Sequence, residues 1–263
     1  MRNLINMNLY RMRKAVSTWV LAIVAVAIAV LDFGIMKIYV DDPFGWGLAE
    51  VTGLTGGMDM MKTITGFLRG TDLLIVLSIF VVIFTNAEQK CGFDKNIIGI
   101  TKHKWKQTLS RWLSAMIGVT AIMALSYGTF TGLSVIFMNS FSAGDMLAYG
   151  KLMLIVYLFY AAFSALFFFF TTLFKSSAGG LVPSLLITTG VLSLITKLLD
   201  LGAEKLFHDP KYLPSDFFLE GAYSAVSPDA SNGTIIRVVA TAAVYLVVAL
   251  GLSMFLQQKR DVR

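Results

Sequence analysis

The chain has 263 residues, of which 56% are hydrophobic and only 14% charged, and its formal net charge is +6. Soluble domains carry roughly a quarter charged residues, so this composition excludes an ordinary soluble protein and indicates an all-α membrane protein. The single cysteine, Cys91, excludes an intrachain disulfide and a cysteine-cluster metal site. The length suits one domain, 1–263, made of membrane-spanning helices.

The first residues, 1–15, predict a short helix ahead of the first span. Apolar residues recur from Ile5 through Leu9 and Met12 to Val16, at spacings that place them on one helical face. The basic residues that lie off this stripe are Arg11, Arg13 and Lys14. We expect an amphipathic helix in the inner headgroup layer. An ordinary chain start that keeps positive charges inside the cell explains the same residues equally well.

Six apolar stretches approach the roughly 20 residues that a helix needs to cross a membrane. In chain order they are 16–40, 73–87, 112–138, 152–174, 176–196 and 238–257. The second is the shortest, so either Thr71 and Asp72 extend it or the bilayer thins there. The basic residues before the first stretch are also typical of a cleaved signal peptide. That apolar run continues to Val40, however, which is too long for a signal peptide.

The charged residues favour one orientation of six alternating spans. With the amino terminus inside, the inner loops and ends hold 14 basic and 3 acidic residues, and the outer ones hold 8 basic and 13 acidic residues. Basic residues are favoured in cytoplasmic loops. We therefore expect a polytopic protein with six transmembrane helices and both termini in the cytoplasm. The proline-rich and aromatic outer segment 198–236 predicts short interfacial or re-entrant helices.

Asp32 is the charged residue that is hardest to place within a span. Lys37 and Lys197 have side chains long enough to reach the headgroups, whereas a carboxylate reaches less far. Ionisable residues inside a membrane are functional candidates, so Asp32 is a candidate intramembrane charge. Three indole rings fall near the predicted inner membrane boundary, where tryptophan is enriched: those of Trp19, Trp105 and Trp112.

Motifs for catalysis and nucleotide binding are missing from the sequence. The stretch 56–63 resembles a P-loop, but Met61 stands where a glycine must precede Lys62. No zinc-protease or serine-hydrolase motif occurs. Met58 and Met60, with Met61, offer soft ligands for Cu(I), although packing as leucine-like side chains is the simpler interpretation. We expect no enzymatic activity, no cofactor in this chain and no nucleic-acid partner.

The predicted inner loop, 88–110, is the most informative segment. Asp94 can cap a short helix, and Thr101 can cap the next one. The first of these helices presents Ile97 and Ile98 on a basic loop, and an exposed apolar pair is typical of a protein interface. The alternative is that both side chains lie back on the membrane.

This loop resembles that of ABC-2-type transporter permeases. Members of that family have a charged interfacial helix, a Glu near the end of span two, a Gly-x-x-Lys-Asn stretch, a basic entry to span three and a basic tail with Arg-Asp. The corresponding residues are Glu88, Gly92, Lys95-Asn96, Lys102 to Arg111 and Arg260-Asp261. The family often has Thr or Ser before the Lys-Asn pair, where this chain has Asp94. The likeness covers the layout of the whole chain through short motifs.

The resemblance implies the membrane-spanning subunit of an ATP-binding cassette exporter in a bacterial plasma (inner) membrane. Two permease copies, or one copy and a paralogue, would pair among membrane lipids. Separate cytoplasmic ATPase subunits would bind ATP and magnesium. They would dock on Asp94, Lys95, Asn96, Ile97, Ile98 and Ile100. The loop would be supported by Glu88, Lys102 and Trp105.

The substrate implied by the resemblance is a hydrophobic or amphipathic molecule that is moved outward. An antimicrobial peptide and a drug are both candidates. The alternative, from a different class, is a non-transporting membrane immunity or scaffold protein that uses the same loop to bind a partner.

Overall fold

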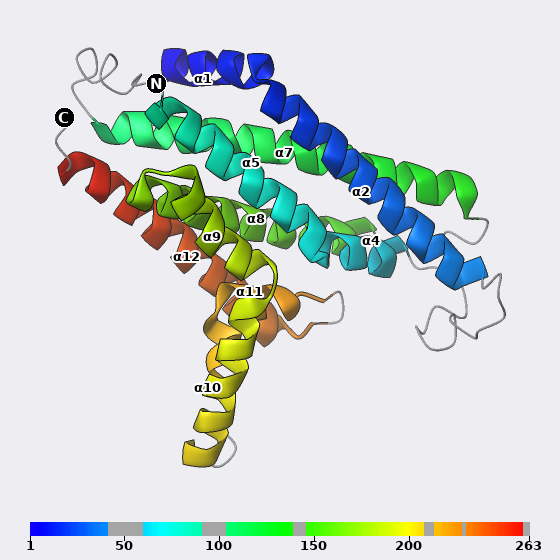
Figure 1. Ribbon diagram of the computed structural model, residues 1–263. Helices are drawn as coiled ribbons and strands as arrows, with labels where there is room; N and C mark the ends of the chain where they lie inside the picture. Colours follow the sequence, from blue (N-terminus) through cyan, green and yellow to red (C-terminus); the bar gives the residue numbers. More distant parts are fainter. Residues whose placement is uncertain (42–59, 91–103, 139–145, 208–212, 228–229, 260–263) are drawn as a thin grey trace.

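The computed structural model describes residues 1–41, 60–90, 104–138, 146–207, 213–227 and 230–259 (Figure 1). Within these ranges the chain is helical and contains no strand, which confirms the predicted all-α class. In chain order the elements are α1 (Arg2–Lys14), α2 (Val16–Asp41), α4 (Met60–Arg69), α5 (Thr71–Lys90), α7 (Lys104–Phe137), α8 (Met146–Phe174), α9 (Ser177–Thr188), α10 (Val191–Phe207), the 3-10 helix η1 (Pro214–Phe217), α11 (Leu219–Ser224) and α12 (Asn232–Lys259).

By length and composition, four of the described helices can cross a membrane: α2, α7, α8 and α12. The helices α9 and α10 meet the same criterion only as a pair, and they are bent by 55° relative to each other. The helix α5 is a shorter apolar helix. These elements indicate a membrane protein with four spans, or five if the bent pair is counted as one.

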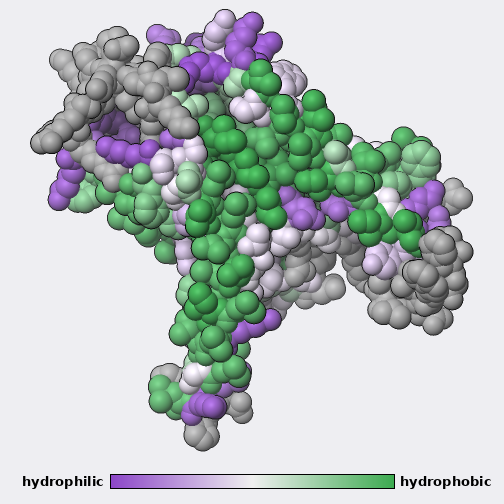
Figure 2. Space-filling model, viewed as in Figure 1, coloured by the Kyte–Doolittle hydropathy of each residue, from purple (hydrophilic) through white to green (hydrophobic). Residues whose placement is uncertain are grey.

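The helix α8 forms the centre of the bundle. It contacts α5, α7, α9, α11 and α12. Of the residues in its most apolar stretch, 61% are buried inside the protein. The corresponding share for α2 and for α12 is only 17%. Both of these helices turn apolar side chains outward, among them Ile23, Leu31 and Val247. Figure 2 shows the resulting apolar surface over the bundle and along α10, as expected for helices in contact with lipid chains.

The bundle has two distinct ends, which we name the α1 end and the α4 end (Figure 1). The α1 end contains α1, the end of α5, the start of α7, the turn between α8 and α9, and the end of α12. The α4 end contains α4, the ends of α2 and α7, and the starts of α5 and α8. Met1 and Lys259 therefore lie at the same end of the bundle.

The helix α1 packs across α7, as its apolar stripe predicts. Met12 is buried and Leu9 is partly buried against the core, but Val16 is 75% exposed. The predicted stripe is wrong at Val16. Ala15 has an extended backbone, so α1 ends before it and Val16 belongs to the next helix, α2. A Cβ at Gly118 of α7 would lie 2.8 Å from the sulfur of Met12 and would overlap the ring of Phe80 from α5. The absent side chain thus lets three helices meet closely.

The predicted fifth span, 176–196, is wrong as a single straight helix. The helix α9 ends at Thr188 and α10 begins at Val191. Between them Gly190 has a φ of +76°, a conformation that glycine adopts without steric cost. The chain therefore bends where the sequence predicts a continuous apolar helix.

One further prediction needs correction at the start of α7. This helix begins at Lys104 and includes both the helix predicted after Thr101 and the predicted third span. Trp112 is 8% exposed and lies in the protein core, so it is not a headgroup anchor as predicted. Trp19, by contrast, is 59% exposed, and its Nε1 donates a hydrogen bond to the carbonyl of Arg13 at 2.9 Å.

The Gly118 contact predicts a destabilised Gly118→Leu variant. The added side chain must displace Phe80 or Met12, and overpacking a core typically costs about 1–3 kcal/mol. We expect a lower thermal unfolding temperature for the variant in detergent. Gly128→Leu on the same helix is the control, since a Cβ at Gly128 meets nothing within 4 Å. Equal unfolding temperatures for the two variants would show that α1 does not pack on α7 at this point.

Candidate functional site

The predicted ATPase-docking residues, Asp94 to Ile100, lie outside the described part of the chain, as does Lys102. The described helices on either side nevertheless locate the segment. The helix α5 ends at Lys90 and α7 begins at Lys104, both at the α1 end, so residues 91–103 connect the two helices there (Figure 1). Glu88 belongs to the last turn of α5. Trp105 is 36% exposed, and the Nζ of Lys106 lies 5.6 Å from its ring centroid.

A layer of buried polar side chains lies at this end of the bundle. Its members are Asn8, Thr85, Asn86, Gln107, Thr108, Ser110, Arg111, Ser114, Thr171, Thr172 and Ser253. The Oγ1 of Thr108 donates to the Oε1 of Gln257 at 2.6 Å, which ties α7 to α12. The Nδ2 of Asn86 donates to the hydroxyl of Ser177, which ties α5 to α9. The two helices that flank segment 91–103 are therefore joined to α9 and α12 by polar contacts.

Arg111 is the largest side chain of this layer and is fully buried. It belongs to α7, which begins at Lys104, and it lies at the α1 end. A signal for this burial was present in the sequence. Gln107, Arg111 and Ser114 recur at helical spacing, so they form a polar stripe on one face of α7.

At the α4 end, the carbonyl of Leu68 holds several helices together. The helix α4 ends at a one-residue break, where the amide of Gly70 bonds back to the carbonyl of Phe67 at 3.0 Å. Carbonyls in the last turn of a helix lack partners within it. The hydroxyl of Tyr160 from α8 donates to the Leu68 carbonyl at 3.1 Å, and the hydroxyl of Tyr223 from α11 donates to the same oxygen. These bonds anchor α11 in the bundle.

Aromatic packing fixes the ring of Tyr223 as well. Its centroid lies 5.3 Å from that of Phe159 and 5.7 Å from that of Phe163, both on α8. Aromatic pairs at such separations stabilise a structure beyond the area they bury. The short helix α11 is therefore held from two sides, by its hydroxyl and by its ring.

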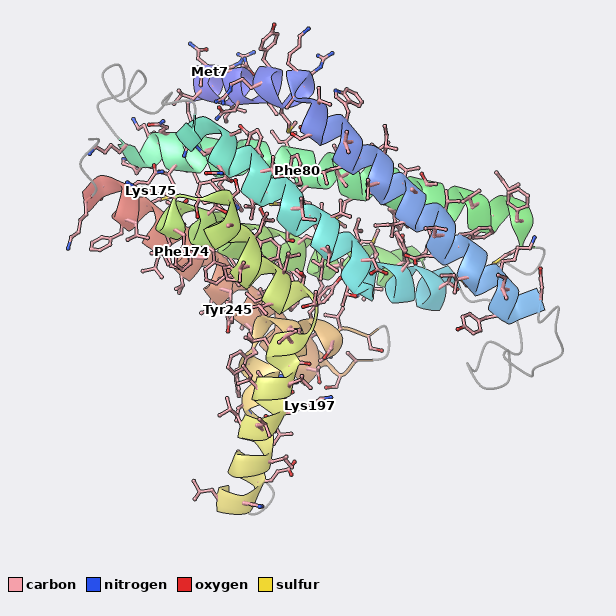
Figure 3. All side chains as sticks on the ribbon, in the orientation of Figure 1. Met7, Phe80, Phe174, Lys175, Lys197 and Tyr245 are labelled. Atoms are coloured by element: carbon pink, nitrogen blue, oxygen red, sulfur yellow. The ribbon has the colours of Figure 1, made fainter. Side chains whose placement is uncertain are left out.

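The predicted outer segment 198–236 contains the end of α10, η1, α11 and the start of α12. The carboxylate of Asp200 on α10 accepts a hydrogen bond from the amide of Ser215 at 2.9 Å. Arg237 on α12 forms an ion pair with Asp216 of η1, also at 2.9 Å. These contacts fix η1 between α10 and α12. The rest of α10 projects from the bundle as an apolar arm, with Lys197 on its surface (Figure 3).

A cavity of about 390 Å³ lies at this end, where α9 bends into α10. Its lining comes from α4, α5, α8, α9 and α11, and consists of Gly66, Gly70, Thr71, Leu74, Phe163, Ile187, Thr188, Glu220, Tyr223 and Ser224. The volume falls within the roughly 300–1,000 Å³ of small-molecule pockets. The wall combines apolar side chains, hydroxyls and one carboxylate, so it suits an amphipathic molecule.

Glu220 is the charged residue of this lining. An ideal Cβ at Gly190 would lie 3.4 Å from its Oε1, so the carboxylate lies against the glycine of the α9–α10 bend. Burial raises the pKa of Glu220 above its usual value of 4.5, because a charged carboxylate loses hydration there. Among the described residues its carboxylate has no hydrogen-bond or ion-pair partner. The sequence analysis missed this residue because nothing local distinguishes it from other loop acids.

Asp32, the predicted intramembrane charge, is half-buried on α2 and does not line the cavity. The carboxylate of Asp72, at the start of α5, is close enough to interact with it electrostatically. One turn further along α2, the Nζ of Lys37 lies 5.3 Å from the centroid of the Phe137 ring. The acids Asp32, Asp72 and Glu220 thus all lie in the half of the molecule at the α4 end.

No family model and no curated protein matches the chain. Within the described ranges, no group of three or more His, Cys, Asp or Glu side chains is placed to hold a metal ion. Cys91, His103, His208 and the candidate copper ligand Met58 lie outside those ranges.

The raised pKa of Glu220 predicts a pH dependence of stability that a Glu220→Gln variant lacks. For a carboxyl whose pKa is raised on folding, protonation stabilises the folded state. That contribution is full below the unfolded pKa and is lost as the pH rises through the folded pKa. The charged groups described on neighbouring elements are Asp72, Asp200 and the Asp216–Arg237 pair. Thermal unfolding in detergent, followed from pH 8 down to about 4.5, measures the effect.

We expect the unfolding temperature of the Gln variant to change less with pH than that of the parent protein. Glu204→Gln is the matched control, since Glu204 is exposed on α10 and outside the cavity. The same pH profile for the parent protein and for Glu220→Gln would contradict the burial of this carboxyl.

Proposed function

We propose that this protein is the membrane-spanning permease subunit of an ATP-binding cassette exporter, driven by a separate cytoplasmic ATPase. The observation that carries the proposal is that α5 ends and α7 begins at the α1 end, which also holds the basic helix α1 and the end of α12. Segment 91–103 is the chain between these two helix ends. This is the place of the docking loop in the permeases that the sequence resembles.

The distribution of charge supports a cytoplasmic α1 end. Apart from Glu88 in the last turn of α5, the acidic residues of the described helices lie in the half towards the α4 end or on α10. They are Asp32, Asp41, Asp72, Asp200, Glu204, Asp216 and Glu220. The α1 end carries Arg2, Arg11, Arg13, Lys14, Lys104, Lys106, Arg111, Lys175 and Lys259. Basic residues near helix ends favour the cytoplasmic side. In this orientation both termini are inside the cell.

Six spans fit the lengths of the helices. The helix α5 has 20 residues, which at 1.5 Å per residue cover about 30 Å, the thickness of the hydrocarbon core. The helix α9 has 12 residues and covers about 18 Å, so the bend at Gly190 falls within the outer part of the membrane. In this arrangement α9 begins the fifth span and the apolar arm α10 lies obliquely in the outer leaflet.

The polar contacts at the α1 end can transmit a conformational change of the ATPase to other helices of the permease. Movement of segment 91–103 displaces α5 and α7, which flank it. The Asn86–Ser177 and Thr108–Gln257 bonds pass this displacement to α9 and α12. The helix α9 ends at the cavity, where it bends into α10, and α12 contacts α11, which lines the same cavity. The cavity wall suits a hydrophobic or amphipathic substrate that leaves towards the outside.

The alternative is a non-transporting membrane immunity or scaffold protein that binds its partner through the same loop. A transport measurement distinguishes the two functions. ATP-dependent movement of an amphipathic compound in vesicles that contain the chain and its ATPase would exclude the alternative.

Ile97→Asp combined with Ile98→Asp tests the docking segment. We expect the double variant to lose co-purification with the ATPase subunit, because two carboxylates replace the apolar pair that the ATPase would cover. Its unfolding temperature should stay unchanged, since the substitutions leave the helices intact. Ile97→Val combined with Ile98→Val keeps the apolar surface and should bind normally. Undiminished co-purification of the Asp variant would refute docking at this segment.

The orientation has a separate test in Cys91, the single cysteine. A membrane-impermeant thiol reagent added to intact cells should leave it unlabelled, and the same reagent should label it after the cells are permeabilised. A Cys91→Ser variant gives the background. Labelling in intact cells would place the segment outside and contradict the proposed function.

A further inference from the structure

The hydroxyls of the cavity wall present oxygen lone pairs rather than hydrogens. Thr188 donates its hydroxyl hydrogen to the carbonyl of Leu185 at 3.3 Å, and Ser224 donates its own to the carbonyl of Gly221 at 2.7 Å. Tyr223 donates to the carbonyl of Leu68. A hydroxyl that donates its hydrogen to a carbonyl can still accept a hydrogen bond from a ligand. Thr71 supplies one more hydroxyl, at the exposed rim.

Glu220 adds a carboxylate, which when ionised also accepts hydrogen bonds and does not donate them. It belongs to the same wall as these hydroxyls and has no partner among the described residues. Burial makes its charge costly unless a ligand compensates for it, as the direction of its pKa shows. Among the described lining residues none is basic, so a ligand can supply a cation to Glu220.

The remaining wall is apolar and aromatic. Leu74, Phe163 and Ile187 line it together with the ring of Tyr223. Phe163 and Tyr223 stand at 83° to each other, so the edge of one ring meets the face of the other. Aromatic faces attract cations as well as alkyl chains. Such a wall accommodates the carbon skeleton next to a charged group.

We propose that this cavity binds the protonated amine of an amphiphile. The ammonium group donates to the carboxylate of Glu220 and to the hydroxyl oxygens of Thr188 and Ser224. The attached carbon chain lies along Leu74, Phe163 and Ile187. As the substrate class of an exporter this assignment rests on the proposed function, whereas binding itself does not.

Equilibrium binding of radiolabelled dodecylamine to the full-length protein in nanodiscs of neutral lipid tests the proposal. Empty nanodiscs give the background from partitioning into lipid. We expect saturable binding at neutral pH that Glu220→Gln weakens about tenfold or more, because a charge-assisted hydrogen bond is lost. Glu204→Gln changes the same charge on exposed α10 and should bind as the parent protein does.

Three competitors test the chemistry of recognition. Dodecyl sulfate and dodecanol have the chain without the cation, and both should compete at least tenfold more weakly than dodecylamine. Dodecyltrimethylammonium has the charge without an N–H donor, and it should also compete more weakly, because the hydroxyl oxygens then lose their hydrogen bonds. Equal competition by the quaternary ammonium would contradict hydrogen bonding to Thr188 and Ser224.

Several outcomes overturn the proposal outright. These are no saturable binding to the parent protein, equal binding by Glu220→Gln and Glu204→Gln, or equal competition by the sulfate. An unfolding measurement on Glu220→Gln confirms that the variant is folded, and binding by Glu220→Asp provides a second test, since a retained carboxylate should restore part of the affinity. No ATPase enters this assay. Undiminished co-purification of the Ile97→Asp, Ile98→Asp variant with the ATPase, together with intact amine binding, would contradict the proposed function alone.

Discussion

The carbonyl of Leu68 is the acceptor on which the α4 end depends. A helix break inside a membrane bundle leaves backbone oxygens without partners, and no water is there to supply a hydrogen bond. Here the break at Gly70 is compensated by two tyrosine hydroxyls from separate helices. Because Tyr160 comes from the central helix α8 and Tyr223 from α11, the same oxygen joins α4, α8 and α11. The cavity forms between these anchored elements.

The two ends of the molecule are held together by different polar contacts. At the α1 end, side chains bond across helices, as Thr108 does to Gln257 and Asn86 to Ser177. At the α4 end, tyrosine hydroxyls from α8 and α11 donate to one backbone carbonyl of α4. Both ends also contain hydroxyls that bond to carbonyls of their own helix, among them Thr171 at the α1 end and Thr188 at the cavity.

The bend at Gly190 connects these two features. The helix α9 starts beside the polar layer, where Ser177 accepts from Asn86, and it ends beside Glu220. A glycine with positive φ tolerates a change of direction that other residues resist. Beyond the bend, α10 makes its main described contacts with η1 and α9.

The sequence by itself determined the all-helical class, the membrane environment and most helix positions, because a lipid-exposed helix needs a long apolar run that composition and hydropathy reveal. It also indicated the helix at residues 1–15. Only the tertiary structure decided the bend at Gly190, the burial of Arg111 and Trp112, and the cavity around Glu220. The reason is physical: a cavity arises where α4, α5, α8, α9 and α11 meet. The desolvation of Glu220 depends on residues that are distant in the sequence, so the residues next to Glu220 in the chain do not reveal it.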